Sequence, residues 1–434
     1  MFRQLTAVLL TICTLLLCVS CAHSGDGENQ ETQSQTKAPT ESSDPDSLFH
    51  TVKDDLPDTM DFGGETIRMI LRSEERYCSE FMAEEAATNV VNDAIYSRNL
   101  GVEDRLNVTI ELNNTNAGAQ INGHGPWANI SNSILSGVCI YDVAVGSAAP
   151  ATNYALQGEY RNLRNVPNLN LDKEYWAQGM LENMTLAGAT YFATGSISTY
   201  FYDSAYVVYF NRNLCNNWGI VPDSIYETVM NGEWTLEHMI NLTKDIYSDT
   251  NGNGPDNEDV YGFGLQVTSA TDGFYSSCDI AMTEILNDGN IQFAVDLDKL
   301  ESVVTALSDF LWSSSGTVAL CENENYEAAD IYLLDQQFAN DRLLFVTDWL
   351  YSTSTSTMKD MQSDYGVLPY PKFDAGQPSY QTYIHDKMSI VGIPITVSDA
   401  RMEMVGAFVE AMASGGQNTV MPAYYEKALT GRYI

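Results

Sequence analysis

The chain has 434 residues, of which 44% are hydrophobic and 11% aromatic, enough to build two or three packed lobes. It carries 58 acidic and 21 basic residues, a formal net charge of −37 at pH 7. Because nucleic-acid binding depends on neutralising phosphates with Lys and Arg, this charge argues against a nucleic-acid partner and suits a soluble surface protein.

The N-terminal segment has the features of an export signal. An almost wholly apolar run follows Arg3 and covers residues 5–19. It is shorter than the ~20 residues that a membrane-spanning helix needs, and it fits the apolar part of a secretory signal peptide. The run stops at Cys21, and the three residues before it resemble the bacterial lipobox, although Cys18 stands where Leu is usual. In such proteins signal peptidase cuts before a cysteine that then carries a diacylglycerol.

We therefore predict a lipoprotein signal peptide over residues 1–20 and lipidation at Cys21. Two acyl chains suffice for stable membrane attachment, so we expect the protein on the extracytoplasmic face of the cell membrane. An ordinary secretory signal followed by a chance cysteine is the alternative.

Residues 21–57 are dominated by Ser, Thr, Gln, Glu, Asp and Pro. Such a composition cannot bury enough apolar surface to order itself, which predicts a disordered tether. Five cysteines remain in the body of the chain, an odd number with no CxxC pair, so most are expected to be buried apolar residues, and one disulfide stays open. These are Cys78, Cys139, Cys215, Cys278 and Cys321.

From residue 58 onward, strand-like and helix-like segments alternate, which is typical of βαβ units and a mainly parallel sheet. Apolar alternation predicts strands over 64–73, 107–112, 141–147, 204–211, 342–349, 364–371 and 389–397. Helical spacing predicts helices over 88–106, 128–137, 212–220, 235–249, 297–312 and 398–414. Thr235 and Ser398 are the expected N-caps of two of these helices, and Trp234 and Trp312 are expected in the core.

Several of these segments, in their order, resemble the extracellular solute-binding proteins of ABC importers, family 1, the maltodextrin-binding-like group. The resemblance covers residues from about 60 to 434. It rests on YDVAVGSAAPATNYALQGEYRNL (141–163), GATYFATGSIS (188–198), YVVYFNRNLCNNWGI (206–220), GEWTLEHM (232–239), DYGVLPYPK (364–372) and MPAYYEKAL (421–429). The family usually continues in helix past the point where this chain ends.

The resemblance implies an α/β fold of the periplasmic-binding-protein-like type II, with two lobes joined by a hinge and the ligand in the cleft between them. It places lobe 1 at residues 58–193 and 378–415, and lobe 2 at residues 194–377 and 416–434. Closure of such lobes captures a ligand, and the closed form is what a membrane partner recognises.

The segment DTNGNGPDNEDVYGFG resembles the start of an EF-hand-like calcium loop. Asp249, Asn251 and Asn253 supply oxygens at alternate positions, and Gly254 permits a sharp turn. Val260 stands where Glu usually closes the loop, so Asp259 or Asp256 is expected to substitute for it. The expected cofactor is therefore a structural Ca²⁺, and an Asx-rich turn without metal is the alternative.

Candidate ligand-binding residues combine aromatic rings, which stack on the apolar faces of sugars, with polar groups that bond to hydroxyls. By the resemblance, Trp349 matches a stacking tryptophan of the cleft, and Tyr424 and Tyr425 match an aromatic pair near its C-terminal wall. The remaining candidates follow strands or the crossing into lobe 2, where open α/β sheets bind ligands. They are Tyr351, Tyr202, Asp203, Ser147, Asn153, Asp272 and Tyr275. Each aromatic ring has packing in the core as its alternative.

No catalytic motif stands out, since the five histidines are scattered and neither a G-x-S-x-G elbow nor a Walker loop is present. We predict a non-enzymatic, monomeric binding protein that captures a small ligand, most simply an oligosaccharide, and delivers it to ABC permease subunits. The alternatives are a surface glycoside hydrolase, which needs two carboxyl groups ~5–10 Å apart, and a carbohydrate-sensing lipoprotein.

Overall fold

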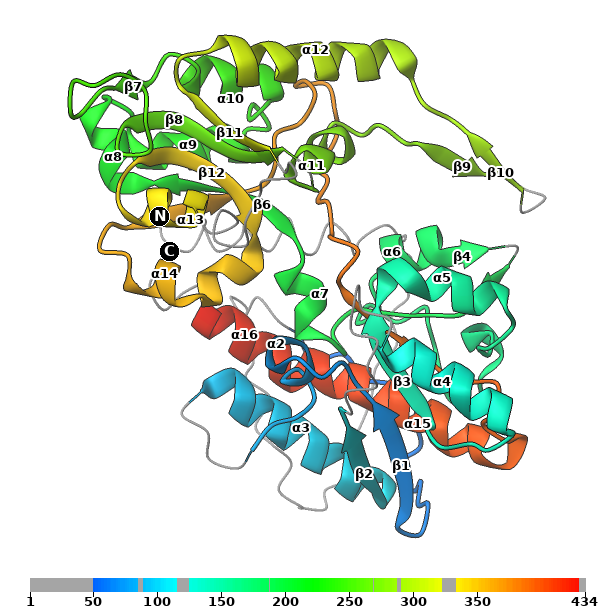
Figure 1. The fold of residues 1–434 in the computed structure, drawn as a ribbon. Coiled ribbons are helices and arrows are strands. Elements are labelled where there is room, and N and C mark those ends of the chain that lie inside the picture. Colours follow the sequence, from blue (N-terminus) through cyan, green and yellow to red (C-terminus); the bar gives the residue numbers. More distant parts are fainter. Residues whose placement is uncertain are drawn as a thin grey trace, which may run out of the picture.

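The computed structural model describes residues 50–84, 89–114, 125–186, 188–267, 269–286, 290–321 and 333–428. They form two α/β lobes, each built around its own sheet and apolar core (Figure 1). Cys21 and most of the predicted tether lie outside the described residues. No helix within the described ranges is long and apolar enough to cross a membrane.

Lobe 1 contains a four-stranded sheet in the order β14-β3-β1-β2. Strand β1 is parallel to its neighbours β2 and β3, and β14 is antiparallel to β3. The predicted alternation in β1 is confirmed, since Ile67 and Met69 are fully buried. The strands are β1 (Glu65–Ile70), β2 (Val108–Asn113), β3 (Val143–Ser147) and β14 (Ser389–Gly392). The helices are α2 (Glu75–Cys78), α3 (Val90–Leu106), α4 (Gly125–Ser136), α5 (Ala148–Leu156), α6 (Gln178–Met184) and α15 (Asp399–Gly415).

Two smaller elements complete lobe 1. They are the 3-10 turn η2 (Leu163–Asn165) and the hairpin of β4 (Thr185–Leu186) and β5 (Ala189–Thr190).

Lobe 2 contains a sheet in the order β11-β8-β12-β6-β13, with β7 paired to β8. Its strands are β6 (Tyr206–Asn211), β7 (Tyr247–Ser248), β8 (Val260–Val267), β11 (Thr317–Cys321), β12 (Leu343–Trp349) and β13 (Tyr365–Leu368). Strand β6 is antiparallel to β12 and β13, and β7 is antiparallel to β8, whereas β8 is parallel to β11 and β12. The helices are α8 (Arg212–Asn217), α9 (Pro222–Met230), α10 (Leu236–Thr243), α11 (Ser269–Ser277), α12 (Leu297–Ser313), α13 (Leu333–Ala339) and α14 (Ser356–Asp360).

A hairpin of β9 (Thr283–Ile285) and β10 (Ile291–Phe293) projects from lobe 2 (Figure 1). Trp312, expected in the core, is 58% exposed on α12, whereas Trp234 is fully buried as expected. The predicted cap at Thr235 is confirmed, because its hydroxyl accepts a hydrogen bond from the His238 amide at 3.2 Å. Ser398 occupies the N-cap position of α15 without a capping side-chain bond.

The two lobes are joined by segments that run antiparallel beside each other at residues 204–206 and 383–385. The Tyr206 amide donates to the Tyr383 carbonyl, and the His385 amide donates to the Ser204 carbonyl, both at 2.9 Å. Helix α7 (Thr199–Asp203) precedes the first of them. The crossings therefore lie later in the chain than the positions 194 and 378 expected from the sequence, because Ile197 and Phe201 still pack in lobe 1 clusters.

A third connection follows α15. The π-helical turn η5 (Gly416–Val420) leads into α16 (Met421–Ala428). Residues of α16 share an apolar cluster with Ile95 of lobe 1 and with Val207 and Tyr209 of lobe 2. The C-terminal segment, assigned to lobe 2 by the sequence, thus packs against both lobes.

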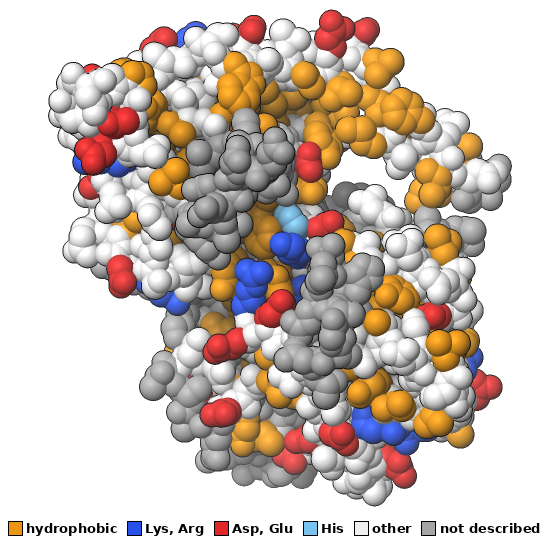
Figure 2. Space-filling view, viewed as in Figure 1, with side chains coloured by type: hydrophobic (Ala, Val, Ile, Leu, Met, Phe, Trp, Pro, Cys, Tyr) orange, Lys and Arg blue, Asp and Glu red, His pale blue; other side chains and the backbone are white. Residues whose placement is uncertain are grey.

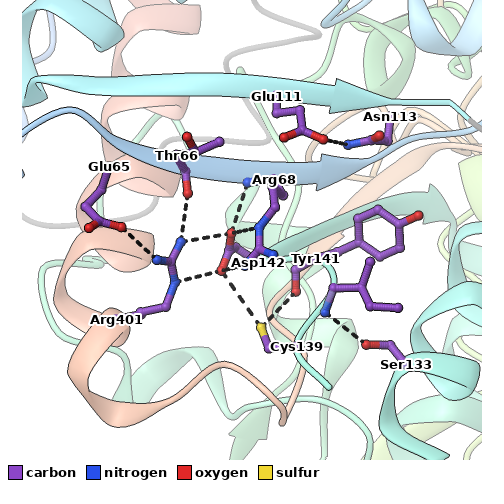
Figure 3. A network of polar contacts seen from close by, with 11 residues as sticks. Glu65, Thr66, Arg68, Glu111, Asn113, Ser133, Cys139, Tyr141, Asp142 and Arg401 are labelled. Atoms are coloured by element: carbon purple, nitrogen blue, oxygen red, sulfur yellow. Dashed lines mark hydrogen bonds and ion pairs between the residues drawn. The ribbon is translucent and has the colours of Figure 1, made fainter. Parts of the chain in front are cut away.

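Helix α15 belongs to lobe 1 although it is distant in sequence from β1 to β3, and a polar network holds it there (Figure 3). Asp142 is fully buried. Its carboxylate accepts from Arg401 Nε at 3.0 Å and from Arg68 Nε at 3.2 Å. Arg401 also donates to the Thr66 carbonyl at 2.7 Å and pairs with Glu65. One buried carboxylate therefore joins the returning helix to the first strand.

The folded part of the chain starts earlier than predicted. Val52 and Leu56, placed in the tether by composition, are buried in the core of lobe 1, each 7% exposed. Between them, Asp54 forms a bidentate ion pair with Arg105 at 2.6 and 2.8 Å. The Asn418 side chain both donates to and accepts from the backbone of Val52 at 2.9 Å. Residues 50–57 form a strap on lobe 1.

We expect a variant that begins at residue 58 to be less stable than one that begins at residue 50. It loses two buried aliphatic side chains, each worth about 1.5–3 kcal/mol of unfolding free energy, as well as the pair of Asp54 with Arg105. Urea unfolding of the two variants measures the difference. Equal midpoints would show that the strap contributes nothing to stability.

Candidate functional site

The candidate site lies where the two crossing segments meet the ends of strands from both lobes. Figure 2 shows a hollow between the lobes, with a histidine and several basic side chains gathered at its floor. This is the region in which the sequence analysis expects a ligand, because the carboxyl ends of strands in open α/β sheets are where ligands bind.

Trp349 stands at the end of β12 on the lobe 2 side of the hollow. It lies opposite Tyr206 in the antiparallel pairing of β12 with β6, and its ring centroid is 4.3 Å from that of His385 on the returning crossing segment. The ring is partly exposed. Its backbone amide donates to the Asp348 carboxylate at 2.7 Å, which fixes the turn after the strand.

Tyr351 follows on the turn η4 (Leu350–Ser354) and faces lobe 1. Its ring lies 6.1 Å from that of Tyr200, and the Arg76 guanidinium is 5.9 Å from its centre. Tyr200 in turn contacts Tyr77 edge to face at 4.6 Å. Rings from α2, α7 and η4 therefore form a continuous row across the hinge, in which Tyr77 and Tyr200 are buried and Tyr351 is partly exposed.

Basic side chains interleave with these rings. The Arg72 guanidinium lies 3.7 Å above Tyr77 and donates to the Lys387 carbonyl at 2.8 Å. Lys387 Nζ lies 5.7 Å from the ring centre of Trp349. We call this set the hinge belt. It consists of Arg72, Arg76, Tyr77, Tyr200, Trp349, Tyr351, His385 and Lys387.

Asp272 and Tyr275 lie beside the hinge belt on α11, hydrogen-bonded to each other. Burial raises the pKa of Asp272, and the nearby His385 opposes that shift. Burial, together with the charge of Asp272, raises the pKa of Tyr383 to about 12. The lobe 2 side thus offers a carboxyl group and neutral phenols that can bond to ligand hydroxyls.

The floor of lobe 1 rests on a buried carboxyl group, Glu80. Its oxygens accept hydrogen bonds from Ser198 and Ser389, and one of them also accepts from the Tyr200 amide at 3.3 Å. Burial raises the pKa of Glu80, and the Arg72 charge opposes that shift. Arg72 reaches the same Ser389 hydroxyl. This network fixes the position of Arg72 and, through it, the loop that carries Lys387.

A pair of buried acidic side chains supports the lobe 2 side. Burial and the neighbouring Asp348 raise the pKa of Asp335 to about 9, and a hydrogen bond joins the two carboxyl groups. Two carboxyl groups this close cannot both ionise, so they share a proton at neutral pH. Asp348 also binds the Ser352 hydroxyl. The pair therefore fixes the segment that presents Trp349 and Tyr351.

Four predicted ligand residues lie elsewhere, at the junction of α7 with α16. Tyr424 and Tyr425 are 5% and 6% exposed and belong to the apolar cluster shared by the lobes. The Tyr424 hydroxyl donates to Asp203 at 2.7 Å, and the Tyr202 ring packs against both tyrosines at 6.2 Å. This arrangement explains the four side chains as packing between α7 and α16, and we leave them out of the proposed ligand site.

The other two candidates differ from each other. Ser147 is buried, and its hydroxyl donates to the Asp386 carbonyl at 3.0 Å, so it positions the loop beside His385. Asn153 is exposed on α5, and no described contact links it to the hinge belt. The sequence analysis missed Arg76, Tyr77, Tyr200, His385 and Lys387. The available signals were the position of Arg76 and Tyr77 after the end of β1 and the closeness of Tyr200, His385 and Lys387 to the crossing segments.

The predicted calcium loop forms a turn held by its own hydrogen bonds. Asp249 accepts from the Gly252 and Gly254 amides at 2.5 and 3.1 Å, and the side-chain amides of Asn251 and Asn253 both donate to Asp256 at 2.9 Å. Asp259, fully buried, accepts from the Tyr247 hydroxyl and from two backbone amides. Within the described residues no three His, Cys, Asp or Glu side chains converge on a metal position. In this conformation the segment forms an Asx-rich turn, and the structural Ca²⁺ stays a prediction from the sequence.

A separate groove of ≈ 520 Å³ lies on lobe 2 between α10 and α12, lined by Leu236, Ile240, Lys244 and Phe310 among others. It shares no residue with the hinge belt.

Comparison with known proteins supports the architecture. No family model matches the sequence, and no curated protein matches it. UspC of M. tuberculosis is similar in structure, with a TM-score of 0.54 at 13% identity over 83% of this chain and 84% of that one. The GacH receptor of Streptomyces glaucescens, solved unliganded and with acarbose, gives 0.50 at 14% identity over 85% and 84%. The predicted fold class, two α/β lobes of the periplasmic-binding-protein-like type II, is confirmed.

We expect Asp203→Asn to flatten the pH dependence of stability. Burial raises the pKa of Asp203 from 3.8 to about 7, so the folded state binds this proton more tightly than the unfolded state. The resulting stability is fully present below pH ~4 and is lost as the pH rises to ~7. Urea unfolding at both pH values measures it, with the exposed Asp360→Asn as control. An unchanged slope in the Asp203 variant would contradict the assignment.

For the loop at 249–259 we expect the melting temperature to be the same in calcium and in chelator, because its carboxylates are already satisfied by amides and hydroxyls. A rise of several degrees in calcium, with one equivalent of the ion in elemental analysis, would instead support the metal site predicted from the sequence.

Proposed function

We propose that this chain is a lipid-anchored solute-binding protein that captures a carbohydrate outside the cell and delivers it to the permease of an ABC importer. It binds the sugar without altering it. The observation that carries the proposal is the hinge belt, in which the partly exposed rings of Trp349 and Tyr351 from lobe 2 lie beside the exposed basic groups of Arg76 and Lys387 from lobe 1, at the floor of a hollow between two jointed lobes.

The geometry supports carbohydrate capture in two ways. Trp349 and Tyr351 offer ring faces for the apolar C–H face of a sugar, while Asp272 and Tyr275 bond to its hydroxyl rim. The lobes meet at short crossing segments, so bending there would close the hollow over a ligand. The GacH receptor, whose fold is similar, binds acarbose.

The remaining parts of the proposal rest on the sequence. The apolar leader ending at Cys21 supports the lipid anchor, and the acidic segment after it is long enough to hold the lobes away from the membrane. The resemblance of the segment order to importer binding proteins supports delivery to a permease.

A thermal-shift screen over mono- and oligosaccharides tests capture, since a ligand at 100 times its Kd stabilises the folded state by ~2.7 kcal/mol. Analysis of each mixture for released sugars tests whether the protein is an enzyme. Stabilisation without product supports a binding protein, whereas cleavage of any binding sugar would contradict the proposal.

For a sugar found in this way, we expect Trp349→Ala to weaken binding by about 1–3 kcal/mol, the scale of a lost aromatic anchor. Trp312→Ala is the matched control, because that ring is exposed on the outer helix α12. Isothermal calorimetry measures both. Equal affinity of the Trp349 variant and the wild type would show that the ring does not contact the ligand.

A further inference from the structure

We infer that the carbohydrate bound here carries a negatively charged group, which Arg76 and Lys387 hold at the lobe 1 edge of the hinge belt. This inference rests on the proposed function and narrows its ligand from saccharides in general to acidic saccharides.

The basic side chains at the hollow contrast with the strongly acidic composition of the protein. The chain has 58 acidic and only 21 basic residues, yet Arg72, Arg76 and Lys387 gather at one edge of the hollow. Within the described ranges, none of the three forms an ion pair with a carboxylate, whereas Arg68, Arg105 and Arg401 on the body of lobe 1 all do. Basic groups without a carboxylate partner, at the cleft of so acidic a protein, point to a ligand whose negative charge pairs with them.

Two of these basic side chains lie beside the partly exposed rings of lobe 2. Arg76 and Lys387 are both exposed and come from lobe 1, but each lies over a ring of lobe 2. Arg76 is 5.9 Å from the centre of Tyr351, and Lys387 Nζ is 5.7 Å from the centre of Trp349. A sugar stacked on either ring would have one cation beside it, within reach of an acidic substituent at its rim.

Buried charged side chains lie beneath the hinge belt and act on the same region. Two buried guanidinium groups, Arg72 and Arg98, lie near the buried carboxyl group of Glu80, and the buried carboxyl group of Asp203 also interacts with Glu80. Arg98 donates to the Glu80 backbone carbonyl at 3.0 Å, so its charge stays close to this layer. Because burial raises the pKa of Asp203 to about 7, its carboxyl group only partly balances the two guanidinium groups, and in a medium of low dielectric constant their field adds to that of Arg76 and Lys387.

The neighbouring acidic groups do not cancel this arrangement. Asp386 lies 3.0 Å from His385 and also interacts with the Lys387 charge, and Glu74 interacts with the Arg76 charge. These acids weaken the positive charge of the two cations, but within the described ranges none of them forms an ion pair with Arg76 or Lys387. Asp272 lies on the lobe 2 side, bonded to Tyr275. The site is thus polarised, with cations on lobe 1 for an acidic group and a carboxyl and phenols on lobe 2 for hydroxyls.

The test measures binding of matched saccharides to the full chain by calorimetry. One arm compares a trisaccharide of galacturonate with the neutral galactose trisaccharide of the same linkage. Further arms use glucose 6-phosphate and glucose 6-sulfate against glucose, and inorganic phosphate alone. We expect at least one acidic saccharide to bind ten times more tightly than its neutral partner, with an affinity that falls as salt is added.

For that acidic saccharide, Arg76→Gln and Lys387→Gln should each weaken binding about ten-fold or more, since each removes a charged hydrogen-bond donor. Lys387→Arg should retain most of the affinity. Lys244→Gln, in the groove of lobe 2, makes the same change of charge away from the hinge belt and should leave binding unchanged. Melting temperatures equal to that of the wild type show that the exposed substitutions leave the fold intact.

The outcomes separate this inference from the proposed function. Neutral saccharides binding as tightly as all acidic ones, with no effect of Lys387→Gln, would overturn the acidic ligand and leave carbohydrate capture standing. Inorganic phosphate binding as tightly as any acidic saccharide would also overturn it, because the site would then serve a simple anion. Binding of no saccharide at all would overturn both.

Discussion

The pairing of residues 204–206 with 383–385 is the constraint on which the site depends. Two backbone hydrogen bonds of 2.9 Å bring the first crossing segment against the second. Tyr206 begins β6, which sets the register of Trp349 at the end of β12, while His385 leads directly to Lys387. The same short stretch of backbone therefore places the Trp349 ring of lobe 2 beside the Lys387 ammonium group of lobe 1. Each of the two residues is attached to the sheet of its own lobe.

The polar groups beneath the hinge belt turn this juxtaposition into a rigid floor. Burying a guanidinium or a carboxyl group costs several kcal/mol unless its bonds are satisfied. Glu80 meets this cost with two serine hydroxyls and an amide, and Arg72 meets it with the Lys387 carbonyl, a serine and two tyrosine faces. On the other lobe, the carboxyl pair of Asp335 and Asp348 fixes the turn after β12. Such networks favour one arrangement over its alternatives more than they add stability.

How far the sequence predicts this structure depends on whether a feature is local. The alternation in β1 and the apolar face of α12 are local, and both elements form where expected. The position of Trp349 could also be predicted, because strand ends mark the ligand edge of an α/β sheet. The positions of Arg76 and Lys387 could not be predicted, since only the pairing of the crossing segments brings them to the same hollow. Val52 and Leu56 were missed because two apolar residues barely change the composition of an acidic segment, although each has a pocket to fill.

The third connection limits how the lobes can move. Ile95 of α3, Val207 and Tyr209 of β6, and Tyr424 and Tyr425 of α16 share one buried cluster, and Tyr424 is bonded to Asp203 of α7. Separating these side chains would expose apolar surface at about 25 cal/mol per Å², whereas bending the crossing segments needs only small changes of backbone dihedral angles. Closure is therefore cheapest as a rotation that keeps this cluster packed and moves the far rims of the lobes. For the ligand capture that we propose, such a rotation would change the hinge belt least, because the belt lies close to the axis, and its rings and cations would be arranged before a ligand arrives.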